Sequence, residues 1–250
     1  MNHNYSHIPA PSLAVITGAS GGLGSALTRL LIDRGWQVLG IDHNRKRMEA
    51  LASELPTGSF HPMVRELQTT GLGRAMEETL KNLPPPRGLV HAAAVSAGAP
   101  INTLTDEEWE LSFAINTTPA MILARTLAPF MTACGGGSIV NVGSPVGTIG
   151  ARKPSYAASK AALQGLTSSL ARNLGSHNIR ANLFLPGPMI TPLTEDWPEE
   201  KRHSIAKGSF LQRLCEPDEA ARSIAFLLSD EASYITGAII DGTGGSMFGH

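Results

Sequence analysis

The chain has 250 residues, of which 42% are hydrophobic, and its 20 Lys and Arg residues against 21 Asp and Glu residues give a net charge of −1. A chain of this length and composition can build a sizeable core as one large domain or two small ones, without a disulfide or metal to stabilise it. The balanced charge, with no block of one sign, argues against binding to nucleic acid or to an anionic membrane.

Short apolar runs alternate with longer amphipathic stretches along the chain. The apolar runs lie at 12–17, 36–41, 88–93, 138–142, 179–185 and 238–241, and they are almost continuously apolar, as strands buried on both faces of a parallel sheet are. Helical patterns lie at 25–34, 45–55, 70–83, 105–116, 156–175 and 217–228. This alternation predicts a single-domain α/β Rossmann fold, a doubly wound parallel sheet with helices on both faces.

No linker or repeat divides the chain, so we expect a flexible tail at 1–11 and one domain over 12–250. Residues 1–11 lack the regions of a secretory signal, and no uncharged apolar run approaches the ~20 residues of a membrane span, which predicts a cytoplasmic protein. The cysteines, Cys134 and Cys215, have no CxxC spacing, and we expect no metal site. The charged and aromatic segment 191–214 breaks the alternation and is a candidate substrate lid.

A glycine-rich turn, TGASGGLG at 17–24, follows the first predicted strand and opens the first helix. Glycines in this context let the backbone approach a pyrophosphate, whose charge then lies on the N–H groups of the helix N-terminus. Asp42 ends the second predicted strand, 24 residues after Gly18, near the spacing at which a carboxylate reaches an adenosine ribose. Separately, the turn suits a tight loop and Asp42 a strand-end cap, but together they predict a dinucleotide site.

Further motifs extend this pattern: YAASK at 156–160, Asn116, Ser144, Pro186-Gly187, and YITG at 234–237 with Asp241-Gly242. With these motifs the chain, from about residue 12 to 245, resembles the short-chain dehydrogenases/reductases. The resemblance implies NAD(P)-dependent hydride transfer between an alcohol and a carbonyl, with Asn116, Ser144, Tyr156 and Lys160 as catalytic residues. It also implies a set of cofactor-binding residues: Gly18, Ser20, Gly22, Leu23, Gly24, Asp42, Glu66, Leu67, Ala93, Tyr156, Lys160, Pro186, Gly187, Ile190 and Thr191.

The helical spacing of Tyr156 and Lys160 places them on one face. Carbonyl reduction needs a proton donor at the developing alkoxide, and a tyrosine with a pKa of ~10 needs a nearby cation to work near pH 7. We expect Lys160 to lower the pKa of Tyr156 and to hold the ribose. Ser144 is expected to bond the substrate oxygen, and the Asn116 side chain to hold a water that links Lys160 to solvent.

The chain departs from the family pattern at three places. The usual Asn-Asn-Ala-Gly is HAAA at 91–94, and we interpret His91 as structural rather than catalytic. Tyr156 follows Ser144 by twelve residues, one fewer than is common, so we expect a reshaped loop that affects substrate specificity. Glu66 stands where the family usually has an Asp that touches adenine.

The cofactor is predicted to be NAD, because the Asp42 carboxylate repels a 2′-phosphate and no basic residue lies at 19–21. NADP is the alternative, since Arg45 and Arg47 lie close by. The expected substrate is a sugar, hydroxy acid or cyclic alcohol in a mixed polar and aromatic pocket formed by Arg152, Lys153, Trp197, Arg202, His203 and Phe210.

Two other functions remain open. The segments VGSPVGTIG at 142–150 and ARNLGSHNIRAN at 171–182 resemble 3-oxoacyl-carrier-protein reductases, although Gly135 and His177 stand where those enzymes carry basic carrier-docking residues. A non-catalytic dinucleotide-binding sensor is the second alternative, and the intact catalytic set argues against it. The Ala-rich helix at 156–175 is apolar on more than one face, and the resemblance implies a homotetramer, or a homodimer, formed through it.

Overall fold

The computed structural model describes residues 12–68, 70–191 and 194–246, so the tail expected at 1–11 lies outside the described residues. Seven parallel strands form one sheet in the order β3-β2-β1-β4-β5-β6-β7. They are β1 (Leu13–Thr17), β2 (Gln37–Asp42), β3 (Phe60–Val64), β4 (Pro86–His91), β5 (Gly137–Val142), β6 (Ile179–Pro186) and β7 (Ile239–Gly242). The strand order reverses between β1 and β4, and ligands of such sheets bind at the carboxyl ends of the strands beside this point.

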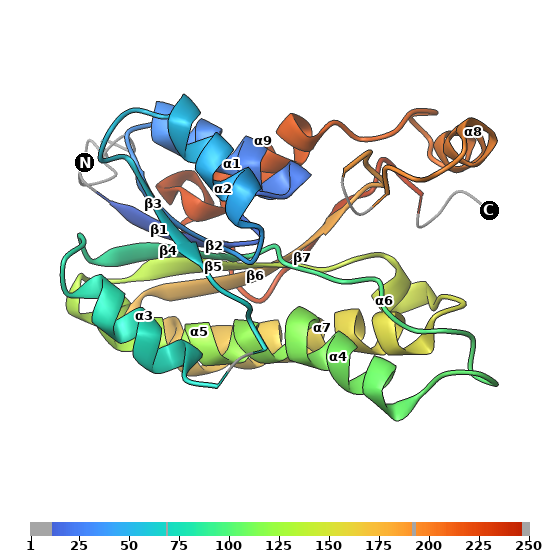
Figure 1. The fold of residues 1–250 in the computed structure, drawn as a ribbon. Coiled ribbons are helices and arrows are strands. Elements are labelled where there is room, and N and C mark those ends of the chain that lie inside the picture. Colours follow the sequence, from blue (N-terminus) through green and yellow to red (C-terminus); the bar gives the residue numbers. More distant parts are fainter. Residues whose placement is uncertain (1–11, 69, 192–193, 247–250) are drawn as a thin grey trace.

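Helices cover both faces of the sheet, which confirms the predicted fold class (Figure 1). One face carries α1 (Gly22–Asp33), α2 (Arg45–Glu54) and α9 (Pro217–Leu228). The other carries α3 (Leu72–Leu80), α4 (Asp106–Asn116), α5 (Thr118–Ala133) and α7 (Pro154–Leu174). The remaining helical segments are α6 (Val146–Ile149), α8 (Glu199–Lys207) and two short 3₁₀ helices at Gly175–His177 and Asp230–Ala232.

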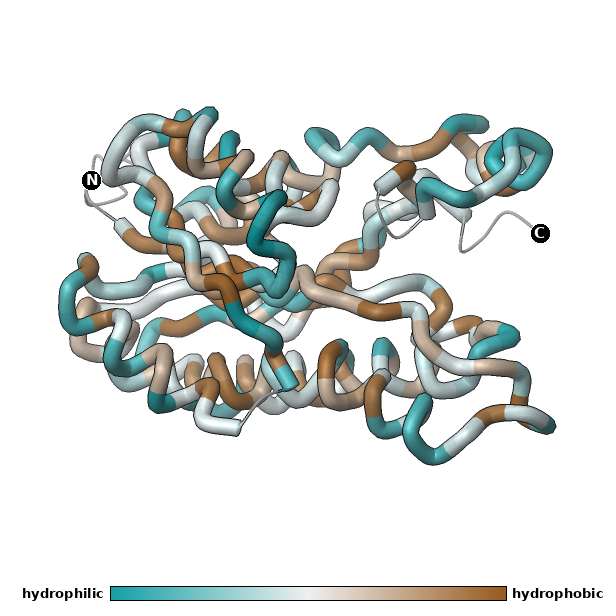
Figure 2. The backbone as a smooth tube through the Cα atoms, in the orientation of Figure 1, coloured by the Kyte–Doolittle hydropathy of each residue, from teal (hydrophilic) through white to brown (hydrophobic). Residues whose placement is uncertain are grey.

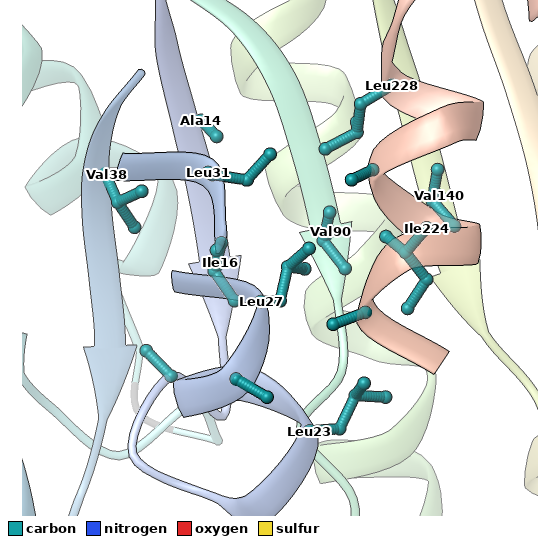
Figure 3. Packing of buried hydrophobic residues seen from close by; sticks show 14 of the residues in the cluster. Ala14, Ile16, Leu23, Leu27, Leu31, Val38, Val90, Val140, Ile224 and Leu228 are labelled. Atoms are coloured by element: carbon teal, nitrogen blue, oxygen red, sulfur yellow. The ribbon is translucent and has the colours of Figure 1, made fainter. Parts of the chain in front are cut away.

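Successive side chains of β1 point to opposite faces of the sheet, and both faces are buried. Ala14 and Ile16 pack with Leu27 of α1 and Ile224 of α9 (Figure 3), whereas Val15 lies in a second cluster with residues of α3 and α5. Burial on both sides explains why the strand runs are continuously apolar rather than alternating. Figure 2 shows the same arrangement, with hydrophobic positions along the strands and hydrophilic positions on the outer surfaces of the helices.

The sequence patterns did not indicate β3, α5, α6 and α8. β3 contains Pro62 and is an edge strand, and proline is tolerated at an edge because part of the backbone there makes no ladder bond. α8 lies within the proposed lid and buries none of its side chains, so it has no apolar stripe to reveal it. Conversely, the capping box expected at the start of α4 is present between Thr105 and Glu108.

None of the helices in the described part of the chain is long and apolar enough to cross a membrane.

Candidate active site

A cleft of about 470 Å³ opens at the carboxyl ends of the central strands. Most of the predicted cofactor-binding residues line it together: Gly18, Ser20, Gly22, Leu23, Gly24, Asp42, Glu66, Leu67, Ala93, Tyr156, Lys160, Pro186 and Thr191. Gly187 and Ile190 are not part of the cleft wall. Gly187 instead donates from its N–H to the carbonyl of Gly242, and Ile190 is 37% exposed.

The glycine-rich turn leaves space that side chains would fill. Gly18 has φ +69°, and a Cβ there would lie 2.9 Å from the Cα of Ala93. A Cβ at Gly24 would collide with the carbonyl oxygen of Gly18. The N-cap of α1 is Gly21, which offers no side chain to the first-turn N–H groups. This cradle at a helix N-terminus fits a pyrophosphate.

Asp42, at the end of β2, is only 9% exposed, and backbone donors fix its carboxylate. Oδ2 accepts from the N–H of Ser20 at 3.1 Å, and Oδ1 accepts from the N–H of Asn44 at 3.1 Å. The imidazole Nδ1 of His43 lies 3.3 Å from the same Oδ1. The carboxylate therefore joins the glycine-rich turn to the β2–α2 connection and retains acceptor capacity for ribose hydroxyls.

Three arginines lie near this carboxylate. Arg45 is 3.8 Å from Glu49 on the same helix. Arg47 lines the cleft, as does Arg65, which no sequence motif pointed to. Arg65 donates from Nη2 to the carbonyl of Thr70. The end of the cleft beside Asp42 is therefore bordered by both a carboxylate and arginine residues.

Tyr156 and Lys160 lie one turn apart in α7, and both line the cleft. Ser144, two residues beyond β5, lies close enough to Tyr156 for a side-chain hydrogen bond, although it is not among the residues that line the cleft. Burial raises the pKa of Tyr156, and the hydrogen bond with Ser144 opposes this shift only in part. The sequence-based expectation of a lowered phenol pKa was therefore wrong in direction, because desolvation of the phenolate outweighs the favourable contacts.

The ammonium of Lys160 is buried and donates to the carbonyl oxygen of Val142 at 2.8 Å. Burial lowers the pKa of Lys160 to about 8. At pH 7 the group is therefore still mostly protonated, and it lies on the same cleft wall as Tyr156.

Asn116 ends α4 and is fully buried. Its Oδ1 accepts from the N–H of Val95, and its Nδ2 donates to the carbonyl of Val95 and to the Oγ of Ser159. Its side chain therefore ties the segment after β4 to α7, and the water-holding role expected from the resemblance stays a prediction. The backbone carbonyl of Asn116 accepts from His91.

The residues expected to form a mixed polar and aromatic pocket do not line the cleft in the described part of the chain. Arg202 donates to the carbonyl of Trp197, and Phe210 is 65% exposed. Lys153 donates to the carbonyl of Ser96. From the lid, only Thr191 contributes to the wall among the described residues.

The wall beside Tyr156 is instead largely apolar, and sequence reasoning missed most of it. It is formed by Ala94, Val95, Ile115, Val142, Gly143 and Met189. In the sequence, these wall residues were indicated only by lying next to predicted site residues, as Gly143 precedes Ser144 and Ala94 follows Ala93. The described residues contain no group of three or more His, Cys, Asp or Glu side chains that could hold a metal ion.

Comparison with known proteins agrees with this geometry. The profile of a family described as Enoyl-(Acyl carrier protein) reductase matches residues 18–246. A solved oxidoreductase of the short-chain dehydrogenase/reductase family from Burkholderia thailandensis superposes with a TM-score of 0.90 at 31% identity, covering 96% of this chain and 94% of that one. The chain belongs to the short-chain dehydrogenase/reductase family. It is an NAD(P)-dependent oxidoreductase that acts on the CH–OH/C=O pair.

Curated members of this family are similar over nearly their whole length. The 3-oxoacyl-[acyl-carrier-protein] reductase FabG of Thermotoga maritima is 34% identical over 238 residues, which cover 93% of this chain and 96% of that one. The (3R)-3-hydroxyacyl-CoA dehydrogenase of Mus musculus is 30% identical over 247 residues, covering 94% of this chain and 95% of that one. The 2,3-dihydro-2,3-dihydroxybenzoate dehydrogenase of Bacillus subtilis is 31% identical over 251 residues, covering 95% and 96%.

Proposed function

We propose that this short-chain dehydrogenase/reductase uses NAD(H) to interconvert a ketone and a secondary alcohol on a small molecule, with Tyr156 as the proton donor and acceptor. The observation that carries the proposal is the position of the Tyr156 phenol on the cleft wall, hydrogen-bonded with Ser144 and one turn from the buried Lys160 ammonium. These three groups together can hold a carbonyl oxygen and deliver a proton to it.

The cofactor would lie along the cleft from α2 to α7. The turn with Gly18, Ser20, Gly22, Leu23 and Gly24 would hold the pyrophosphate, and Asp42 the ribose hydroxyls. Glu66 and Leu67 would contact the adenine, and Lys160 the second ribose. Ala93, Pro186 and Thr191, which line the cleft, would surround the nicotinamide. When bound, the nicotinamide of the cofactor supplies or accepts the hydride.

In the reductive direction, Tyr156 donates its hydroxyl proton to the oxygen that becomes the alcohol. Ser144 positions that oxygen, and the Lys160 ammonium stabilises the phenolate that remains. Because burial raises the pKa of Tyr156, the phenol stays protonated at neutral pH. The proposal therefore assigns carbonyl reduction to neutral pH and alcohol oxidation to more alkaline conditions, where the phenolate can accept a proton.

The choice of NAD over NADP rests on Asp42. Its buried carboxylate at the ribose end supports NAD, because a 2′-phosphate would add negative charge beside it. Arg45 is not among the described residues that line the cleft. Arg47 and Arg65 on the same wall support NADP as the alternative cofactor.

The substrate end of the cleft favours an uncharged compound. Among the described residues that line this end, Lys160 is the one with a charge, and its neighbours include Val95, Ile115 and Met189. Of the substrates expected from the sequence, a cyclic alcohol or its ketone fits an apolar wall better than a hydroxy acid does. The names of the similar reductases and dehydrogenases support a 3-oxoacyl compound as the alternative.

A substrate panel followed by absorbance at 340 nm, in both directions and with each cofactor, tests this function. Cyclic ketones, sugars, hydroxy acids and 3-oxoacyl thioesters are the four arms. We expect NADH oxidation with a cyclic ketone. Turnover with 3-oxoacyl thioesters alone would favour the reductase alternative, and NADH binding without any turnover would favour the sensor. The homotetramer and the cytoplasmic location expected from the sequence belong to the same proposal.

A further inference from the structure

His91 is a fully buried residue at the end of β4, and both of its ring nitrogens have partners. Nδ1 lies 2.9 Å from the Oγ1 of Thr17, at the end of the neighbouring strand β1. Nε2 lies 3.0 Å from the backbone carbonyl oxygen of Asn116, at the end of α4. One imidazole therefore joins two strands of the sheet to the helix end that contains Asn116.

The groups at the two ends of this series of hydrogen bonds, the carbonyl of Asn116 and the N–H of Ala93, fix the direction of each bond in it. The carbonyl oxygen of Asn116 can only accept, so the Nε2 of His91 carries the proton. Nδ1 is then an acceptor and receives the hydroxyl proton of Thr17. The Thr17 oxygen accepts in turn from the N–H of Ala93, which lies in the cleft wall against Gly18. Only the Nε2–H tautomer of a neutral histidine satisfies this arrangement.

The charge state of His91 agrees with that tautomer. Burial, and after it the positive charge of Lys160, lower the pKa of His91 to about 3. The ring therefore stays neutral over the whole range in which the enzyme can be assayed, and it adds no second cation beside Lys160.

The series of hydrogen bonds continues from Asn116 to the turn of α7 that contains Tyr156. The Nδ2 of Asn116 donates to the Oγ of Ser159, and Ser159 donates from Oγ to the carbonyl oxygen of Tyr156. Thr117, the next residue after Asn116, donates to the carbonyl oxygen of Ser159. Two successive residues thus attach the end of α4 to the turn of α7 between Tyr156 and Lys160.

We infer that His91 is a positioning residue, which uses its two ring nitrogens to hold the cofactor-side backbone at Thr17 and Ala93 in register with Asn116 and hence with Tyr156. The inference rests on the proposed role of Tyr156. Loss of His91 should therefore lower kcat even in a variant that remains folded. The reason is that a small displacement of the phenol relative to the cofactor slows proton and hydride transfer.

The test compares His91→Leu, which removes both hydrogen bonds, with His91→Gln, whose amide offers one acceptor and one donor. His61→Leu is the matched control, because His61 makes a ring hydrogen bond with Gln37 between β3 and β2, and this bond reaches neither Asn116 nor α7. Each variant is measured for urea unfolding, NADH affinity by fluorescence, and kcat and KM at saturating cofactor. Tyr156→Phe is assayed in parallel.

We expect His91→Leu to lower kcat by about 10-fold to 100-fold while KM changes much less, and His91→Gln to restore most of kcat. His61→Leu should lower the unfolding midpoint but leave kcat within about 2-fold. If His91→Leu does not fold, Thr17→Val removes the same link at its other end and should lower kcat in the same way. If His91→Leu has the same kcat as the wild type, the role of His91 is purely structural. Where Thr17→Val replaces it, an unchanged kcat in Thr17→Val leads to the same conclusion.

A second readout does not depend on activity. Nitrogen-15 NMR of the imidazole should show an unprotonated Nδ1 and a protonated Nε2 at pH 7, with no titration down to about pH 5. A proton on Nδ1, or a titration at the ordinary pKa, would overturn the proposed chain. If Tyr156→Phe keeps wild-type turnover, the proposed function fails; if only the His91 variants do, the positioning role alone fails.

Discussion

The ammonium group of Lys160 donates to the backbone carbonyl oxygen of Val142, 2.8 Å away. This bond attaches α7 to the last residue of β5, so the strand fixes the position of the ammonium group. The hydrogen bond gives the buried ammonium an acceptor that no sequence motif indicated. Because Tyr156 lies one turn earlier in α7, the same bond also helps to fix the position of Tyr156 relative to β5.

Tyr156→Phe should lower turnover by ~10²–10⁴-fold while NADH affinity stays nearly unchanged, because the change removes only the proton donor. Stopped-flow absorbance at 340 nm on a substrate from the panel measures this loss. Tyr234→Phe is the control, since Tyr234 is fully exposed and should leave turnover unchanged. Retention of most of the turnover by Tyr156→Phe, with hydride transfer rate-limiting, would remove Tyr156 from the mechanism.

Lys160→Met should weaken both NADH binding and turnover, because it deletes a proposed ribose donor and the cation that stabilises the phenolate. Any remaining alcohol oxidation should need a higher pH than in the wild type, since the phenolate loses that stabilisation. Fluorescence titration with NADH and a pH series of kcat separate the two effects. A variant that binds NADH normally and keeps its pH profile would contradict both assigned roles.

Asp42 should determine the choice of cofactor. We expect kcat/KM with NAD(H) to exceed that with NADP(H) by at least ~10-fold, or about 1.4 kcal/mol, and Asp42→Ala to reduce the difference. Asp33→Ala changes an exposed carboxylate at the end of α1 and should leave the ratio as it is. Because Asp42 also accepts from Ser20 and Asn44, unfolding curves must accompany the kinetics. Preference for NADP(H) in the wild type would mean that Arg47 and Arg65 outweigh the carboxylate.

His91 should make folding sensitive to acid. Its folded-state pKa, lowered to about 3, lies below the ordinary value of 6.5, so the unfolded chain binds the extra proton first as the pH falls. The stabilising contribution is therefore complete above pH 6.5 and is lost as the pH falls toward 3, with about 2 kcal/mol lost by pH 5. Urea unfolding at pH 7 and pH 5 should show this loss in the wild type relative to His91→Gln, which cannot titrate. A difference between the two proteins that does not change with pH would contradict the lowered pKa.

The protein should be a homotetramer, or a homodimer, in solution. Large apolar side chains are exposed on α4 and α5, with Trp109 41%, Leu111 39% and Met121 37% exposed, and they lie on the same face of the sheet as α7 (Figure 1). Light scattering at micromolar concentration measures the mass, and Trp109→Glu should shift it toward the monomer. A monodisperse wild-type monomer would contradict this prediction.

The sequence by itself predicted the features that depend on local or periodic patterns. Continuous apolar runs indicated strands buried on both faces, and the glycine-rich turn was recognisable from the spacing of its glycines directly after such a run. The four-residue spacing of Tyr156 and Lys160 followed from helix geometry alone. These signals are short-range, so one sequence was enough to show them.

Only the tertiary structure decided the electrostatics and the hydrogen-bond partners of the site. The pKa of Tyr156 depends on how many neighbours remove water from it, and those neighbours come from separate strands and loops. The partners of His91 are 74 and 25 residues away along the chain, so no local pattern could name them. The sequence singled out Tyr156 and Lys160, whereas their environment arose from the packing of α4 and α7 against the ends of β4 and β5.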